Sequence, residues 1–435
     1  MLYKKLENHF EQIESRDAQV LEVRNTLFAL LPQTYSRRVV MDRLCMGIAL
    51  LALKTTNTCW QTSVADIMKH GSASAEQCFV SLLLLKYIPD LIENHCLDRK
   101  SKFVVQNYAR DNLKSVLGYF AQVLNQQGLP QECYLEALSG AKAWCQFSSA
   151  SYVVNLQFSE TLLKLLQTPL FAKAVKVVMK LLSVSTNAKS LHSIRQEDAI
   201  SLKDVKPDDR VFLEQVVITL QQLLPRFKSN PFVMQYSEEG DESAEGRFAR
   251  KYVSLVTCLC SNYENLLVPQ SELSQNLFGI VKECSKAPNL RLSILALEFW
   301  ADFKETMKVC NLTDNLHLLN QFKEVSEIML GQSVLIPSIP YDQLLQEEIE
   351  ELEVTEKGVS MVTFREHTSD ILINTFLLLQ KSYGEQGEQA IYDILLKTLR
   401  QGFETKAFFE MEVCLFAARS IYDGFDDQNW NQSTL

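Results

Sequence analysis

Residues 170–182 read Leu-Phe-Ala-Lys-Ala-Val-Lys-Val-Val-Met-Lys-Leu-Leu. Apolar residues recur every three or four positions in this stretch, while Lys173, Lys176 and Lys180 fall on the other side of a helical wheel. This spacing predicts an amphipathic helix that packs on one face. The simplest interpretation of the lysines is a solvated helix face, and contact with an acidic partner or a nucleic acid is the alternative.

The same helical spacing recurs along almost the whole chain. We expect further helices at residues 43–54, 76–87, 112–124, 211–224, 252–267, 290–307, 370–380 and 411–422. No stretch shows a convincing alternation of period two, and the 435 residues include only 14 Gly and 11 Pro from which turns are usually built. The sequence therefore predicts an all-α protein.

Four prolines stand at nearly constant intervals. Pro89, Pro130, Pro169 and Pro207 are 41, 39 and 38 residues apart, close to the length of a two-helix repeat of HEAT or armadillo type. Three of them stand where a helix would start. We expect residues 1–435 to form a single α-α superhelix, a HEAT/armadillo-like repeat solenoid in which stacked helix pairs share one core.

The negative charge of the chain is concentrated in two segments. The chain has 53 acidic and 43 basic residues, a net charge of −10. Segments 237–246 and 341–356 hold twelve of the acids and no base, which leaves 41 acids against 43 bases elsewhere. The two segments are therefore acidic inserts in a nearly neutral helical body.

Two interpretations of these inserts remain open. They either attract Lys- and Arg-rich partners or only keep solvated loops soluble. Candidate contacts for a basic partner are Asp342, Glu347, Glu348, Glu350, Glu351, Glu353 and Glu356. Weaker candidates lie in the first insert, at Glu238, Glu239, Asp241, Glu242 and Glu245.

The sequence contains no signature of catalysis or cofactor binding. It has no phosphate-binding glycine loop, no metalloprotease His-Glu motif and no serine nucleophile elbow. His95 and Cys96 are chain neighbours whose side chains point apart, and Cys258 and Cys260 fall on different sides of a helix, so ordinary structural roles explain both pairs better. We expect no enzyme activity, no cofactor and no metal site.

Composition also indicates the compartment and the class of partner. Eleven cysteines without C-x-x-C spacing, and the lack of an apolar N-terminal segment, predict reduced thiols in the cytosol. Every apolar run is shorter than the roughly 18 residues that span a bilayer. Net negative charge, without basic stretches interleaved with aromatics, argues against direct nucleic-acid binding.

Several strings, taken in order, resemble a known family. Residues 42–53 (Asp-Arg-Leu-Cys-Met-Gly-Ile-Ala-Leu-Leu-Ala-Leu) and 59–67 (Cys-Trp-Gln-Thr-Ser-Val-Ala-Asp-Ile) resemble early HEAT repeats of the β-karyopherins, the importin-β superfamily, in the branch of importin-thirteen and transportin-three. Residues 82–90 resemble the end of that family's leucine-rich helix, and 364–372 resemble its Phe-Arg-x-x-Arg-x-Asp-Ile element. Other similar strings are 258–264, 295–300 and 412–421.

The resemblance implies a nuclear transport receptor that shuttles between cytoplasm and nucleus. Such receptors carry cargo proteins through the nuclear pore, bind phenylalanine-glycine nucleoporins and are controlled by the GTPase Ran. Cargoes in this branch include serine/arginine-rich splicing factors and other RNA- or DNA-handling proteins. Family members are considerably longer, so we expect this chain to lack the first repeats and the C-terminal half, which leaves Ran control open. The alternative is a HEAT-repeat scaffold or adaptor without transport activity.

Overall fold

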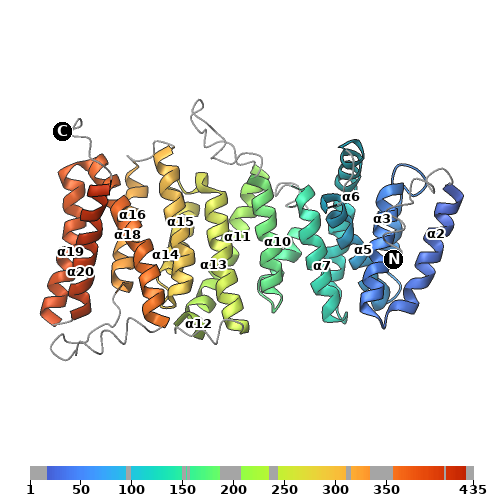
Figure 1. Ribbon diagram of the computed structural model, residues 1–435, viewed down its shortest axis with the longest axis horizontal. Helices are drawn as coiled ribbons and strands as arrows, with labels where there is room; N and C mark the ends of the chain where they lie inside the picture. Colours follow the sequence, from blue (N-terminus) through green and yellow to red (C-terminus); the bar gives the residue numbers. More distant parts are fainter. Residues whose placement is uncertain are drawn as a thin grey trace. The chain divides into compact units, whose positions relative to one another are not determined.

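The computed structural model describes residues 17–94, 99–148, 153, 157–186, 207–234, 243–309, 315–333, 356–405 and 408–427. Within these ranges it contains 17 α-helices, three short 3-10 helices and no strand, which confirms the all-α prediction (Figure 1). None of the described helices is both long and apolar enough to cross a membrane.

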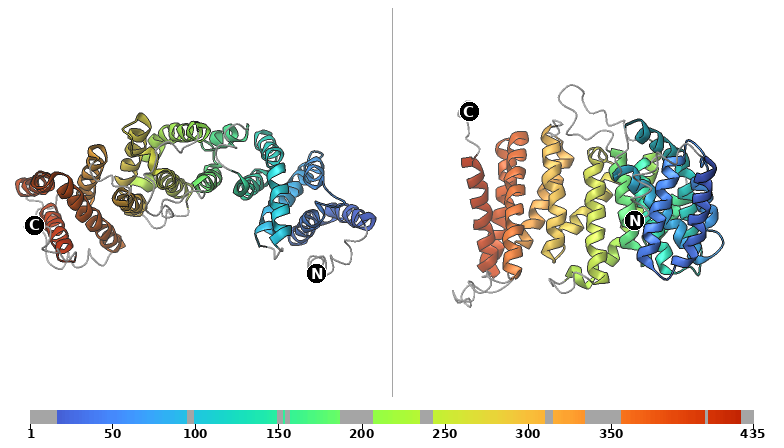
Figure 2. Two further views of the ribbon diagram at one scale, coloured as in Figure 1. Left: turned by 90° about the horizontal axis from the view of Figure 1, so that it is seen from above. Right: turned by 45° about the vertical axis from the view of Figure 1, so that its right-hand side comes forward.

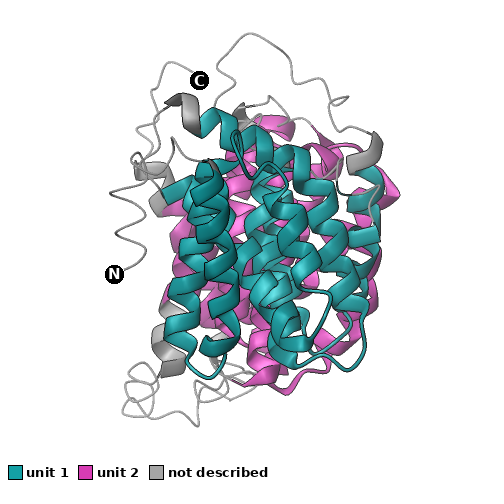
Figure 3. Cartoon of the chain, turned by 90° about the vertical axis from the view of Figure 1, so that its right-hand side faces the viewer, with its two compact units in different colours: residues 1–188, 205–215 teal, residues 189–204, 216–435 magenta. Residues whose placement is uncertain are grey.

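The chain divides into two compact units (Figure 3). Unit 1 comprises residues 1–188 and 205–215, and unit 2 comprises residues 189–204 and 216–435. The division falls within α11 (Pro207–Lys228). The expectation that residues 1–435 form one continuous solenoid depends on how the two units are joined, and it stays a prediction.

Unit 1 is a double layer of helices. Helices α3, α5, α7 and α10 each contact the next and form one layer, while α4, α6 and α9 form the other. Figure 2 (left) views them nearly along their axes. Their bounds are α2 (Asp17–Leu30), η1 (Leu31–Thr34), α3 (Arg38–Thr55), α4 (Ser63–His70), α5 (Ala75–Asn94), α6 (Arg99–Asn125), α7 (Gln131–Trp144), η2 (Cys145–Phe147), α9 (Gln157–Leu165) and α10 (Phe171–Thr186).

Unit 2 repeats this arrangement, with α13, α15, α18 and α19 in one layer and α14, α16 and α20 in the other. Phe278 of α14 stacks on Trp300 of α15, which meets Phe322 of α16 edge-on, so aromatic rings join the layers. The bounds are α12 (Pro231–Met234), α13 (Ala244–Asn262), η4 (Glu264–Leu266), α14 (Glu272–Ser285), α15 (Leu290–Val309), α16 (Leu316–Gln332), α18 (Glu356–Tyr383), α19 (Glu385–Thr405) and α20 (Phe408–Asp427).

The helix predicted from residues 170–182 is α10. Phe171, Ala174 and Val178 of its apolar stripe are buried, and Lys173 and Lys176 on the opposite face are exposed. Burial of this stripe, rather than intrinsic propensity, holds the helix in place, because an isolated helix of this length is marginal in water. All the other predicted stretches also contain a helix, and most are longer than predicted.

Local capping decides where several helices begin. Ser243 accepts a hydrogen bond from the Gly246 amide at the start of α13 (2.9 Å), and Ser271 accepts one from the Ser274 amide at the start of α14 (3.1 Å). The prediction of one helix over 252–267 places the helix end too late, because α13 stops at Asn262 and the short η4 follows it.

The resemblance of residues 82–90 to a helix end predicts that the helix stops near Pro89, and this prediction is wrong. Helix α5 continues to Asn94. Proline has no N–H, so the Leu85 carbonyl four residues earlier loses its helical donor. The indole Nε1 of Trp144 in α7 donates to that carbonyl at 2.7 Å, and this replacement bond allows the helix to run through the proline.

Candidate functional site

The acidic candidates lie almost wholly outside the described residues. This holds for Asp342, Glu347, Glu348, Glu350, Glu351 and Glu353, and for Glu238, Glu239, Asp241 and Glu242. Glu245 is exposed in the first turn of α13, and Glu356 is the first residue of α18. Both helices thus begin inside segments expected as inserts. Because a carboxylate is favourable at a helix N-terminus, Glu245 has a structural explanation.

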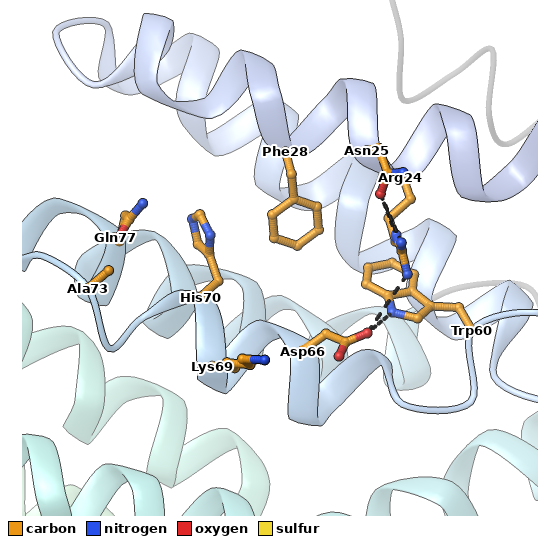
Figure 4. A pocket seen from close by; sticks show the side chains of 9 residues that line it. All are labelled: Arg24, Asn25, Phe28, Trp60, Asp66, Lys69, His70, Ala73 and Gln77. Carbon is orange, nitrogen blue, oxygen red and sulfur yellow. Dashed lines mark hydrogen bonds and ion pairs between the residues drawn. The ribbon is translucent and has the colours of Figure 1, made fainter.

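A cleft of about 520 Å³ lies between α2 and α4 in unit 1, and we call it the α2–α4 cleft (Figure 4). Buried Trp60 lines this cleft and donates from Nε1 to Asp66 Oδ2 at 2.8 Å. Arg24 lies 5.5 Å from the Trp60 ring centre and 3.8 Å from the same carboxylate oxygen. The remaining lining residues are Asn25, Phe28, Lys69, His70, Ala73 and Gln77.

Two polar atoms in the α2–α4 cleft are buried without a hydrogen-bond partner, His70 Nε2 and Gln77 Oε1. Burial lowers the pKa of His70, so its imidazole is neutral at pH 7. Phe28 packs edge-on against this imidazole, with 5.1 Å between the ring centres. The cleft therefore combines an aromatic wall with unsatisfied neutral hydrogen-bonding groups.

A larger groove of about 630 Å³ lies where α3, α5 and α7 meet, and we call it the α3–α5–α7 groove. Arg38 stacks over half-buried Phe79, 4.4 Å from the ring centre, and its guanidinium lies 3.1 Å from Glu136. Lys86 bonds the other oxygen of Glu136 at 2.9 Å. The lining contains three carboxylates and one guanidinium. Its residues are Tyr35, Ser36, Arg38, Met41, Ala75, Glu76, Phe79, Pro130, Glu132, Cys133, Leu135 and Glu136.

The string 364–372, singled out by resemblance, places an arginine at a helix junction. The Arg365 guanidinium donates two hydrogen bonds to the Glu412 carboxylate, at 2.9 and 2.6 Å, and two to the Ser333 carbonyl, at 3.2 and 2.8 Å. It also lies 5.2 Å from the ring centre of Phe416. Arg365 of α18 therefore ties the end of α16 to α20, and its polar groups are used in holding unit 2 together.

The cysteines of the described ranges are packing residues. Nine are free thiols and seven of these are buried. Burial raises the pKa of Cys258 to about 11 and of Cys133 to about 12, so neither is a thiolate at pH 7. The structure places no group of three His, Cys, Asp or Glu side chains suited to a metal ion among the residues it describes. His95 and Cys96 lie outside those residues.

Sequence reasoning missed all of these clefts. The string 59–67 contains Trp60 and Asp66, but nothing in it indicates that Arg24 and Phe28 of another helix complete a cleft around them. The available signal was a run of polar residues on otherwise amphipathic helices, and that signal does not show which helices become neighbours.

One family model matches part of the chain. Residues 37–178, which run from just before α3 into α10, match the family described as Exportin 1-like protein. This region lies in unit 1 and includes the α3–α5–α7 groove except for its edge at Tyr35 and Ser36.

Curated relatives extend the similarity over most of the chain. Importin-13 of Gallus gallus is 22% identical over 413 residues, covering 89% of this chain and 38% of the relative. Importin-13 of Homo sapiens is 22% identical over 440 residues, covering 96% and 40%. The chain thus spans about 40% of the length of the curated relatives it matches.

A solved structure described as "Importin13 cytosolic state" has the same fold, with a TM-score of 0.61 and 13% identity over 92% of this chain and 46% of that one. The fold is therefore the helical-repeat solenoid fold predicted from the sequence. The family match over residues 37–178 and the importin-13 similarity over most of the chain confirm the resemblance to the β-karyopherins of the importin-β superfamily.

Proposed function

We propose that this chain is a segment of a nuclear transport receptor that binds cargo proteins and carries them through the nuclear pore. The observation that carries the proposal is the similarity to importin-13 over 89–96% of the chain. Under this proposal the protein works by binding rather than catalysis, shuttles between cytoplasm and nucleus, and has phenylalanine-glycine nucleoporins and Ran as further partners. Its cargoes are basic proteins, among them RNA- or DNA-handling proteins.

The α3–α5–α7 groove supports the choice of a basic cargo. Glu76 and Glu132 are exposed at its edge, and half-buried Phe79 and Leu135 provide apolar surface between the helices. A peptide with a basic residue beside an apolar one would satisfy both features, because opposite charges steer association while buried apolar area slows dissociation.

The experiment is a capture from nuclear extract on the immobilised chain, followed by elution with Ran held in its GTP form or its GDP form. We expect nucleoporins with phenylalanine-glycine repeats to be captured, and other bound proteins to be released only by the GTP form. An unrelated helical-repeat protein on the same support controls for adhesion to exposed apolar surface.

Two results would contradict the proposal. Absence of nucleoporins, together with equal retention of partners in both forms of Ran, would favour the HEAT-repeat scaffold. Release by both nucleotide forms alike would show simple competition between proteins and not nucleotide control.

A further inference from the structure

A third cleft, of about 350 Å³, lies in unit 2 between α14 and α16. Four of its lining residues carry carboxamides: Gln270 from the loop before α14, Gln275 from the first turns of α14, and Asn320 and Gln321 from α16. We call it the carboxamide cleft. Gln321 Oε1 is buried with no hydrogen-bond partner. The other three side chains are exposed, so these three are open to a ligand, while Gln321 contributes an unsatisfied acceptor behind them.

The carboxamide cleft is close to electrically neutral. Glu324 at its edge is paired with Lys282 of α14. His317 packs edge-on against Phe278, and its Nε2 lies 3.4 Å from Ser274 Oγ. Burial lowers the pKa of His317, and nearby Lys282 lowers it further against the opposing effect of Glu324. A neutral imidazole and a compensated carboxylate give no attraction to phosphate groups or to strongly basic segments.

One apolar side chain stands among these polar groups. Leu316, the first residue of α16, is 58% exposed. The Asn315 side chain caps the helix by accepting from the Leu318 amide at 3.3 Å, which fixes where Leu316 projects. The cleft therefore offers apolar contact at one point and paired donors and acceptors around it.

We propose that the carboxamide cleft binds an extended, uncharged peptide segment of a partner protein through the peptide's main chain, with one apolar side chain of the peptide against Leu316. A carboxamide has both an N–H donor and a carbonyl acceptor, which are the two groups that each peptide unit of an extended strand presents. Four of them line this one cleft, so it holds donors and acceptors for more than one peptide unit. This inference is independent of the proposed transport function.

The probe is a capped heptapeptide, acetyl-Thr-Ser-Thr-Leu-Thr-Ser-Thr-amide, titrated into the full chain and followed by ligand-observed NMR, which detects weak binding. A second peptide carries N-methyl groups on the three central amides, so that it keeps every side chain but loses main-chain donors. We expect saturable binding of the first peptide and affinity at least about tenfold weaker for the second, because unpaired polar groups in the cleft are costly.

Two variants test the protein side, Gln275→Ala and Asn320→Ala, both at exposed positions, where we expect truncation to leave the fold intact. Each should weaken binding of the unmethylated peptide about three- to tenfold, the range for one lost hydrogen bond. Gln157→Ala, at an exposed carboxamide on α9 in unit 1, is the matched control and should leave the affinity unchanged.

Four results would overturn the inference. The first is no saturable binding, and the second is equal affinity for the N-methylated and the unmethylated peptide. The third is an affinity of both cleft variants equal to that of the wild type. The fourth is binding only after the central leucine of the peptide is replaced by phenylalanine. The last result would indicate a pocket for an aromatic side chain, as expected of nucleoporin contacts, instead of main-chain recognition.

Discussion

Glu264 is a carboxyl group that folding removes from water. It lies in η4, where α13 has ended and α14 has not begun, and it is 6% exposed. Thr306 of α15 donates a hydrogen bond to its Oε2 at 2.7 Å. Burial raises the pKa of Glu264 to about 7, the charge of Asp302 adds to the increase, and the Thr306 bond opposes it.

The raised pKa of Glu264 makes stability depend on pH. Between about pH 4.3, where a glutamate titrates in an unfolded chain, and its folded pKa of about 7, the folded state binds more protons than the unfolded one. Raising the pH through this window therefore lowers the free energy of unfolding, and the full penalty is present above pH 7.

We predict that Glu264→Gln removes this penalty and keeps an acceptor for Thr306. The difference in unfolding free energy, variant minus wild type, should be about 3 kcal/mol larger at pH 8 than at pH 4. Urea unfolding followed by circular dichroism at both pH values measures it. Glu272→Gln, an exposed position in the same unit, is the control. An equal effect of Glu264→Gln at both pH values would contradict the prediction.

At the scale of helices, the bond from Trp144 to the Leu85 carbonyl explains how α5 passes through Pro89. The bond links α5 and α7, two adjacent helices of one layer. Without it, the Leu85 carbonyl of α5 and the indole N–H of Trp144 in α7 would both be buried without a partner. Losing the donor should cost about 1–3 kcal/mol, because the carbonyl then stays buried without a partner.

A double-mutant cycle tests this link. Trp144→Phe should destabilise the chain, and its cost should fall by about 1 kcal/mol when Pro89→Ala restores a helical N–H for the Leu85 carbonyl. The cavity left by the smaller ring is the same in both backgrounds and cancels. Trp300→Phe removes an indole that donates to Ser285 Oγ at 3.2 Å with no proline involved, so its cost should not depend on residue 89. Additive costs for Trp144→Phe and Pro89→Ala would rule out the link.

The predictability of these elements follows from the range of the forces involved. The stripe of α10 was readable because apolar repetition is local to the helix that it builds. The end of α13 at Asn262 and the continuation of α5 past Pro89 were not readable, since caps and cross-helix bonds decide them. The carboxamide cleft was missed for the same reason. Ser274 and His317, which meet there, are 43 residues apart in the chain, and no local pattern joins them.

At the scale of the whole molecule, the acidity of the chain belongs to two short segments. Without them, 41 acidic residues stand against 43 basic ones. A long-range attraction for basic partners would therefore originate from segment 341–356 more than from the helical body, and salt would screen it within about 10 Å at 0.1 M ionic strength. The proposal that this segment contacts cargo or Ran follows from that distribution.

We predict that charge reversal to lysine at Glu347, Glu348, Glu350, Glu351 and Glu353 weakens binding of a basic partner, more at low salt than at high salt, without lowering thermal stability. The matched control reverses five exposed glutamates within helices, Glu22, Glu93, Glu298, Glu327 and Glu366, and changes the net charge equally. Affinity measured by isothermal calorimetry at two salt concentrations distinguishes the sets. Equal weakening by both would assign the effect to total charge, and an unchanged affinity at low salt would exclude the segment.

The three described tryptophans give each unit its own optical reporter. Trp60 and Trp144 lie in unit 1 and Trp300 lies in unit 2, all at most 1% exposed. Indole emission shifts to longer wavelength when water reaches the ring. With Trp430 and the tryptophans of one unit replaced by phenylalanine, fluorescence comes from the other unit alone. Denaturation of the two halves can then be recorded separately in an intact chain, which shows whether they melt together or one after the other.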